Sequence, residues 1–311
     1  MHRRQKNILI IGGMGFIGIH LTCQLLMNEN ISITVFGRNA DEYPLFLKNN
    51  DRIHIILDDF CRITNFSELI AGHEYVYHLI STNVPATSNK MISDELLLNI
   101  QSTTLMLEAC VQQQVKRICF VSSGGAIYGL SGYMAKEDDS PLQPITSYGI
   151  QKLTIEKLLY LYYYQYGIDY RIVRMSNPYG PFQRTDGLQG VVSTFVKKAL
   201  QGDELIVYGD GTVVRDYIYI TDAVNALLKV MQDHTAYKLY NIGSGKGMSV
   251  NEVILSIQEV IGKNLPVRYE AGRKVDVPVN VLNIKRYEEE FGQIENIDFI
   301  TGLKKTADFY R

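Results

Sequence analysis

The sequence predicts an α/β protein with a Rossmann-type doubly wound parallel sheet and a smaller C-terminal lobe. Three observations predict this fold class. Short apolar runs alternate with helical patterns through the first half of the chain. A glycine-rich turn, from Gly12 to Gly18, follows the first apolar run. Beyond residue 177 the alternation loosens into loops and short helices, which is typical of a second, smaller unit.

Each element follows from its local pattern. Continuous apolar runs predict strands that are buried on both faces, at 7–11, 32–36, 53–57, 75–79, 117–121 and 170–174. Helical spacing predicts helices at 17–27, 95–114, 148–166, 191–200, 222–231 and 250–261. We expect a dinucleotide-binding domain over 1–176 and mainly a substrate-binding lobe over 177–311. The two are interleaved, because a strand near 238–241 can return to the main sheet.

Composition narrows the function classes. Apolar residues make up 46% and charged residues 21% of the 311, as in ordinary globular proteins. A net charge of −2 does not favour nucleic acid or an anionic membrane as a partner. No run is apolar for long enough to span a membrane, and the run after the basic start is too short for a signal peptide. We therefore expect a cytoplasmic protein with four buried, reduced cysteines (Cys23, Cys61, Cys110, Cys119) and no metal site.

The glycine turn predicts a dinucleotide site. Gly12, Gly15 and Gly18 allow a tight turn, close approach of the backbone to a ligand, and close packing of helix on strand. The helix that follows then points its N-terminal N–H groups at a pyrophosphate.

The end of the second strand bears on the choice of cofactor. An acidic residue there would accept the ribose hydroxyls of NAD. This chain instead has Phe36-Gly37-Arg38, in which a guanidinium could tolerate a 2′-phosphate. The pattern favours NADP slightly over NAD. Alternatively, Arg38 stacks on the adenine or faces solvent.

Tyr148 and Lys152 are four residues apart and therefore share one helical face. An ammonium beside a phenol favours the tyrosinate, so we expect Lys152 to lower the pKa of Tyr148. A tyrosine tuned in this way can take a proton from a sugar hydroxyl while hydride leaves the carbon. The pair thus indicates redox chemistry on an alcohol or a carbonyl.

Further motifs extend over almost the whole chain. They are Asp59-Phe60, His78-Leu79-Ile80-Ser81, Asn99, the stretch from Ser122 to Gly129, Tyr148-Gly149-Ile150-Gln151-Lys152, the stretch from Arg174 to Pro181, Tyr208-Gly209-Asp210-Gly211, Arg215-Asp216-Tyr217, and Arg273 to Val277. With the glycine turn, they resemble the extended short-chain dehydrogenase/reductases of the NAD-dependent epimerase/dehydratase family.

The resemblance implies roles for individual residues. The cofactor would contact Gly12, Gly15, Phe16, Ile17, Gly18, Arg38, Asp59, Phe60, Leu79, Ile80, Ser81, Asn99, Tyr148 and Lys152. Asp59 and Phe60 match the pair at the adenine. Asn177, Arg215, Arg273 and Asp276 match contacts to the diphosphate and ribose of a nucleotide sugar. Asn280 matches a residue that sets pocket size, and its small side chain favours a bulky C2 substituent such as N-acetyl.

One position departs from the family pattern. The slot that usually holds a Ser or Thr hydroxyl near the reacting oxygen is Gly124 here. Either Ser123 supplies the hydroxyl or water does, and we favour Ser123 as the third catalytic residue with Tyr148 and Lys152. The same stretch lacks the acidic residues of dehydratases and of related decarboxylases, which disfavours a 4,6-dehydratase.

Three functions remain open on the sequence. The first is a nucleotide-sugar C4 epimerase that acts through a transient 4-keto sugar with an NAD(P) cofactor, with a UDP-sugar as the expected substrate. The second is a 4-keto-sugar reductase that consumes NADPH, which Arg38 would favour. The third is a cofactor-sensing regulator without activity. The resemblance also implies a homodimer that pairs the helices at 95–114 and 148–166.

Overall fold

The main sheet of the computed structural model has seven parallel strands in the order β11-β7-β5-β4-β1-β2-β3. The structure describes residues 5–81, 88–130, 133–185, 190–232, 235, 237–273, 275–295 and 297–311. The strands are β1 (Lys6–Ile11), β2 (Ile31–Gly37), β3 (Ile53–Leu57), β4 (Tyr75–His78), β5 (Arg117–Ser123), β7 (Asp169–Met175) and β11 (Leu239–Ile242). The predicted Rossmann-type fold class is confirmed.

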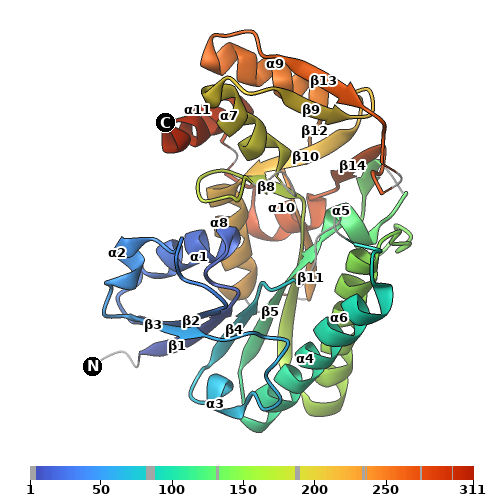
Figure 1. Ribbon diagram of the computed structural model, residues 1–311. Coiled ribbons are helices and arrows are strands. Elements are labelled where there is room, and N and C mark those ends of the chain that lie inside the picture. The colour runs from blue at the N-terminus through green and yellow to red at the C-terminus, as the bar shows by residue number, and fades with distance from the viewer. Residues whose placement is uncertain are drawn as a thin grey trace.

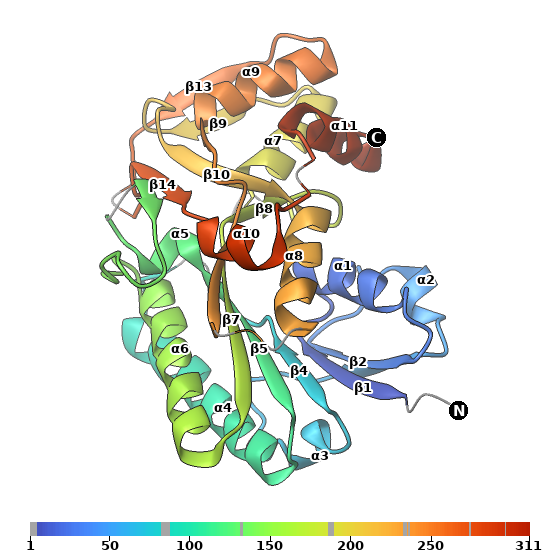
Figure 2. The same ribbon diagram turned by 180° about the vertical axis from the view of Figure 1, so that it is seen from behind.

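Helices cover both faces of this sheet (Figures 1 and 2). α1 (Phe16–Leu25) and α8 (Ile220–Gln232) pack against each other. On the opposite face lie α3 (Ser67–Ile70), α4 (Ile92–Gln112) and α6 (Ser147–Tyr166). Alternate residues of β1 divide accordingly, because Ile8 and Ile10 join one buried cluster while Leu9 and Ile11 join the other. A short helix, α2 (Leu45–Lys48), precedes β3.

The second lobe is built from short strands that the sequence did not predict. β10 (Val214–Tyr219) pairs with β8 (Asn177–Tyr179), β12 (Gly247–Ser249) and β14 (Val279–Leu282), and β9 (Leu205–Tyr208) pairs with β13 (Val267–Glu270). The helices α7 (Val191–Gln201), α9 (Val250–Ile261) and α11 (Phe299–Tyr310) lie with them at the far end of the molecule from β1 (Figure 1). All of these strands except β10 are runs of three or four residues, which are too short for a reliable periodicity.

The two lobes exchange strands. β11 comes late in the chain but pairs with β7 of the main sheet. Conversely, β6 (Tyr133–Ala135) precedes α6 but pairs with β14 of the second lobe. We keep the division at residues 176 and 177 as a proposal, with this interleaving.

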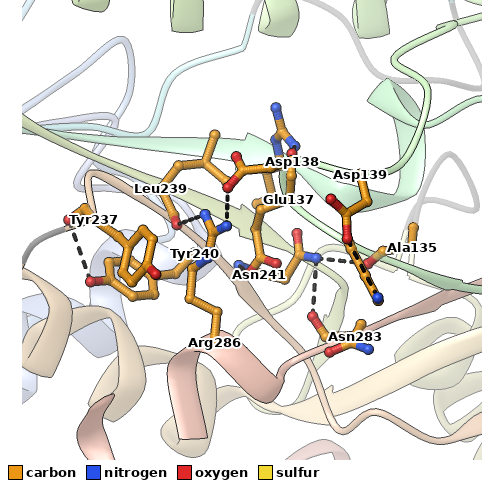
Figure 3. Close-up of polar contacts among 12 residues, drawn as sticks. Ala135, Glu137, Asp138, Asp139, Tyr237, Leu239, Tyr240, Asn241, Asn283 and Arg286 are labelled. Carbon is orange, nitrogen blue, oxygen red and sulfur yellow. Dashed lines mark hydrogen bonds and ion pairs between the residues drawn. The ribbon is translucent and has the colours of Figure 1, made fainter. Parts of the chain in front are cut away.

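Side chains join the lobes along β11 (Figure 3). Asn241 Nδ2 donates to the main-chain oxygens of Ala135 (2.9 Å) and Asn283 (3.1 Å). Arg286, on α10 (Lys285–Phe291), donates from Nη1 to the main-chain oxygen of Leu239 (3.2 Å) and pairs with Asp138. β11 is an edge strand of the main sheet. Side chains, rather than a further strand, therefore provide hydrogen-bond donors for these main-chain oxygens on and beside it.

The cysteines only partly match expectation. Cys110 and Cys119 are buried, as predicted, and all four thiols are free. Cys23 and Cys61 are partly exposed, which corrects the expectation that all four are buried. Apolar neighbours in the sequence do not bury a side chain whose helix or loop position faces outward.

Candidate active site

The glycine turn between β1 and α1 is held by close packing. Gly12 has a φ of +88° and lies against the segment after β4, since a Cβ placed on it would be 3.0 Å from Ile80 Cγ1. A Cβ on Gly18 would lie 2.4 Å from the Cα of Gly13. Gly15 occupies the N-cap of α1 and has no side chain with which to cap it. The first-turn N–H groups of α1 are therefore available to an anion.

The predicted cofactor residues gather at the carboxyl ends of adjacent strands. The glycine turn follows β1, and Leu79, Ile80 and Ser81 follow β4, the neighbouring strand. This edge of the sheet is where open α/β folds bind ligands. Phe16 and Ile17, in the first turn of α1, are partly buried.

The ends of β2 and β3 supply the predicted adenine side. Arg38 is exposed directly after β2 and lies near the turn after β3, because the main-chain N–H of Asp58 donates to the oxygen of Gly37 at 3.1 Å. Asp59 Oδ1 accepts from the main-chain N–H of Cys61 at 3.0 Å. Phe60 is 2% exposed and packs its ring against Phe66 and His78. Only the main chain of Phe60 is thus free to meet a ligand, because its ring is part of the core.

The catalytic candidates Tyr148, Lys152 and Ser123 come together at the end of β5. Thr146 caps α6 by accepting from Gly149 N at 3.1 Å, which places Tyr148 in the first turn of the helix. Ser123 ends β5, and its hydroxyl lies close enough to the phenol to act on the pKa of Tyr148. Lys152 Nζ lies 5.8 Å from the centroid of the Tyr148 ring.

The pKa of the phenol differs from the sequence-based expectation. Burial raises the pKa of Tyr148, and the Ser123 hydroxyl offsets part of that rise. We expected Lys152 to lower this pKa, but the pKa is raised, and Lys152 is not among the groups that act on it. Lys152 Nζ instead donates to the main-chain oxygen of Val121 at 2.9 Å, and burial lowers its own pKa to about 7 although the charge of Glu156 raises it. An amine whose pKa is lowered by burial and which donates its hydrogen bond to the main chain acts only weakly on the phenol.

Two further polar groups surround Lys152. Glu156, one helical turn later, is buried and accepts from Ser122 Oγ (2.5 Å) and from Arg174 Nη2 (2.7 Å). Burial, helped by the charge of Lys152, lowers the pKa of His78 to about 3, so its imidazole is neutral. The sequence analysis missed Glu156, although its spacing of eight residues from Tyr148 places it on the same helical face.

Gly124 lacks a hydroxyl because its neighbour leaves no room for one. A Cβ on Gly124 would lie 2.6 Å from Cδ1 of Leu282, which ends β14 and is fully buried. Asn280 Nδ2 donates to the main-chain oxygen of Gly124 at 3.1 Å, and Asn280 is also fully buried. Its Oδ1 has no partner among the described residues. A Cβ on Gly125 would lie 3.7 Å from Ser123 Oγ and 3.9 Å from Asn280 Oδ1, so both oxygens border one small space.

The other predicted substrate residues lie on β8, on β10 and in the segment before β14, whereas Asn280 is on β14 itself. Asn177 Nδ2 donates to the main-chain oxygen of Asp216 at 3.1 Å. Arg215 donates to the main-chain oxygens of Val214 (2.9 Å) and Val277 (2.6 Å). The charges of Asp276 and Arg273 act on the pKa of Arg215. Arg273 and Asp276 form an ion pair with two hydrogen bonds (2.8 and 3.1 Å), and the Arg273 guanidinium lies over the ring of Tyr208. The two arginines therefore lie in one charged neighbourhood.

The described part of the chain meets the requirements of neither a metal site nor a membrane-spanning helix. It contains no group of three or more His, Cys, Asp and Glu side chains placed to hold a metal ion. None of its helices is long and apolar enough to cross a membrane.

Comparison with known proteins gives consistent matches over the whole chain. The family model described as "NAD dependent epimerase/dehydratase family" matches residues 8–243. A Methanocaldococcus jannaschii protein provisionally named UDP-glucose 4-epimerase is 32% identical, with 98% of each chain covered. A dTDP-4-dehydro-6-deoxyglucose reductase of Escherichia coli is 30% identical (98% of each), and a UDP-N-acetyl-alpha-D-glucosaminuronate decarboxylase of Bacillus cytotoxicus is 32% identical (99% of this chain, 98% of that protein).

Solved structures agree closely with this backbone. The UDP-glucose 4-epimerase of Thermotoga maritima, solved with UDP-glucose, superimposes with a TM-score of 0.88 at 30% identity, covering 98% of each chain. The UDP-glucuronic acid 4-epimerase of Bacillus cereus, solved with UDP-glucuronic acid and NAD, gives a TM-score of 0.87 at 25% identity and the same coverage. The named relatives thus share a fold but differ in reaction.

Proposed function

Because this chain belongs to the NAD-dependent epimerase/dehydratase family, we propose that it is a nucleotide-sugar C4 epimerase. One observation carries the proposal: Ser123 at the end of β5 and Tyr148 in the first turn of α6 bring two hydroxyls to the strand edge that also carries the glycine turn. Such a pair can hold one sugar oxygen and exchange its proton.

The residues at the strand edge fit a nicotinamide dinucleotide. Gly12 and Gly18 let the backbone approach a pyrophosphate, and the open N-terminus of α1 favours its charge. Asn99 Oδ1 is buried and has no partner among the described residues, so it can accept from a ligand amide. Leu79, Ile80, Ser81 and Lys152 would line the same site. When bound, the nicotinamide accepts a hydride and returns it.

The chain's own residues would manage the proton. The Tyr148 side chain would react as the phenolate, which takes the proton of the C4 hydroxyl and later returns it to the same sugar oxygen; the positive charge of a bound oxidised nicotinamide would favour that form. Ser123 would donate a hydrogen bond to the sugar oxygen and so keep it beside the phenol. Lys152 has a pKa of about 7, so it would supply positive charge to the site mainly below that pH.

The substrate in this proposal is a nucleotide-diphosphate sugar, with UDP as the expected nucleotide. Arg215 and Arg273 offer planar donor groups that suit phosphate oxygens. Arg273 is paired with Asp276, so a diphosphate would have to share or displace that carboxylate. Asn177 adds an amide at the start of β8.

Asn280 supports a sugar with an N-acetyl group at C2. Its unpaired Oδ1 is an acceptor that could receive an acetamido N–H. Because Asn280 is fully buried, a large replacement would disturb packing, and Asn280→Ala is the better probe. In that variant KM should rise more for UDP-N-acetylhexosamine than for UDP-hexose, and an equal rise for both would remove this part of the proposal.

A 4-keto-sugar reductase is the second candidate, because Arg38 rather than a carboxylate follows β2. One relative also has a reductase name. A dehydratase or decarboxylase is less compatible with the residues, since Ser123-Gly124-Gly125-Ala126 provides no carboxyl group. Leu282 gives Gly124 a packing reason, which weakens the case for a regulator whose site has decayed.

The experiment combines cofactor content with turnover. Purified protein is denatured, the released nucleotide is identified by absorbance and mass, and the native protein is incubated with UDP-, dTDP- and GDP-sugars. Bound NAD together with interconversion of C4 epimers supports the epimerase. An empty site, with NADPH oxidised only in the presence of a 4-keto sugar, would support the reductase instead.

A further inference from the structure

Four polar side chains connect α4 to the catalytic helix α6, where the two helices pack side by side (Figure 1). Glu95 and Asn99 are one turn apart on α4, and Ser147 and Gln151 are one turn apart on α6. Ser147 Oγ donates to the Glu95 carboxylate, Gln151 Nε2 donates to the Glu95 main-chain oxygen, and Asn99 Nδ2 donates to Gln151 Oε1 at 2.9 Å. We call these four residues the polar ladder.

The polar ladder brackets Tyr148. Ser147 immediately precedes the tyrosine, and Gln151 follows it by three residues, directly before Lys152. Ser147 and Gln151 are at most 1% exposed, and the bond from Asn99 to Gln151 is buried, whereas the two bonds to the partly exposed Glu95 are part-buried. The first turn of α6 can therefore shift along α4 only if these hydrogen bonds break.

Glu95 also closes the start of α4. Its carboxylate accepts from the main-chain N–H groups of Asn89 (3.2 Å), Lys90 (3.3 Å) and Met91 (3.2 Å). Asn89 has a φ of +67°, and its Oδ1 accepts from Ser147 N at 2.8 Å. Burial opposes ionisation, but the bonds from Ser147 and from these main-chain groups lower the pKa of Glu95 overall. One carboxylate thus fixes the starts of both helices.

We propose that Glu95 is a positioning residue for the proton-transfer step, setting the place of the Tyr148 phenol through Ser147 and Gln151. The inference deepens the proposed function and rests on it only for the catalytic consequence. Loss of the carboxylate would remove the bond from Ser147 and so loosen the first turn of α6, while the bond from Gln151 to the main-chain oxygen of residue 95 remains. Displacement of a reacting group by about 1 Å can reduce turnover about 100-fold, so a smaller loosening should still be measurable.

The chain offers a matched control in Glu252. It is the N3 residue of a capping box on α9, where it accepts from the main-chain N–H (2.7 Å) and the hydroxyl (2.6 Å) of Ser249. Glu252→Ala also removes a carboxylate that closes a helix start. α9 belongs to the second lobe, and the residues assigned to the active site are not on it.

The experiment compares Glu95→Ala, Ser147→Ala and Glu252→Ala with wild type. Hydrogen–deuterium exchange of the peptide over 146–152 is measured by mass spectrometry, and kcat and KM are measured with the UDP-sugar that turns over. In Glu95→Ala we expect this peptide to exchange at least about ten times faster than in wild type. We also expect kcat to be at least about tenfold lower, with KM nearly unchanged. Ser147→Ala should show a smaller effect in the same direction, and Glu252→Ala should match wild type in both measurements.

The two readouts separate the two proposals. Exchange and kcat of Glu95→Ala equal to wild type, or an equal kcat loss in Glu252→Ala, would overturn the positioning role. Faster exchange without a change in kcat of an active enzyme would overturn it as well. If wild type turns over no nucleotide sugar, the proposed function fails while the exchange data still test the polar ladder. If Glu95→Ala does not fold, Ser147→Ala decides: faster exchange with a lower kcat supports the positioning role, and wild-type values overturn it.

Discussion

Leu282 fills the space beside Gly124 in which a serine or threonine side chain would otherwise stand. A Cβ on Gly124 would be 2.6 Å from Leu282 Cδ1 and 2.7 Å from its Cδ2. The leucine cannot easily withdraw, because it is packed in a buried cluster with Ile127, Tyr128 and Ala135. The two residues are thus complementary in size.

This complementarity predicts how a hydroxyl at position 124 would behave. Gly124→Ser alone should destabilise the protein by about 1–3 kcal/mol, because the added atoms overpack a filled site. Leu282→Ala alone should cost about 2–5 kcal/mol, but combined with Gly124→Ser it should cost less than the sum of the two single effects, since the smaller residue makes room. Denaturant unfolding of wild type, both single variants and the double variant measures the coupling.

Additive effects in this double-mutant cycle would contradict the size relationship. Turnover gives a second reading. If Ser123 supplies the catalytic hydroxyl, Ser123→Ala should reduce kcat in the otherwise unchanged protein. In the Gly124→Ser/Leu282→Ala protein the same substitution should reduce kcat less, because the serine introduced at position 124 offers a second hydroxyl. Full activity of Ser123→Ala in the wild-type background would leave water as the remaining candidate for that hydrogen bond.

The sequence predicted the parts of this molecule that depend on local pattern. The strand around Ile10 is buried on both faces, and the turn at Gly12 and Gly18 requires glycine, so apolar runs and residue identity were sufficient. The second lobe was only outlined, because β9 and β13 are four residues each and pair across more than fifty residues of chain. Such a pairing has no local signal.

The candidate site shows the same limit. The order of Tyr148, Lys152 and the glycine turn indicated the chemistry, but the pKa of the phenol depends on where the ammonium points. Lys152 Nζ is bonded to the main chain of Val121, a contact between α6 and β5 that spacing does not reveal. Likewise, Leu282 is 158 positions after Gly124, so the reason for that glycine was invisible before the fold was known.

The turn after β2 should control cofactor choice. Gly37→Asp should shift binding toward NAD, because a carboxylate accepts ribose hydroxyls and repels a 2′-phosphate. The new Cβ would be 3.1 Å from Met14 Sδ, so Gly37→Asn is the matched control for the added size. Titration of NAD and NADP against wild type and both variants measures the affinity ratio. An equal change of the NAD/NADP affinity ratio in both variants would show that the charge at position 37 does not determine cofactor choice.

We predict a homodimer through the outer faces of α4 and α6. Both helices expose apolar side chains, among them Leu97 (60% exposed) and Leu98 on α4 and Ile150 and Leu161 on α6. Light scattering at micromolar concentration should give twice the chain mass, and Leu97→Asp combined with Leu161→Asp should shift the protein to monomer. A wild-type monomer at this concentration would remove the prediction.

Lys152 should make stability depend on pH in a specific direction. Its pKa in the folded chain is lowered to about 7 from the usual 10.5, so above pH 7 the unfolded state binds more protons than the folded state. The unfolding free energy should therefore rise with pH between about 7 and 10 through this group, and the penalty for its buried charge should be complete below pH 7. Lys152→Met lacks this dependence. Its stability advantage over wild type should shrink as pH rises across that window, and a constant difference would contradict the lowered pKa.

Tyr148→Phe tests the residue on which the mechanism depends. The substitution removes the phenol oxygen but keeps the ring, so packing at the start of α6 should be preserved. Turnover should fall by about 10²–10⁴-fold, the usual range for general acid–base catalysis. Cofactor and substrate affinity should change little, since the glycine turn and the arginines are untouched.

Lys152→Met should also lower activity and move the pH optimum slightly upward, because the phenol loses a weakly acting cationic neighbour. A pH–rate profile for wild type and both variants with a UDP-sugar panel measures these effects. Activity retained in Tyr148→Phe would show that another group exchanges the proton.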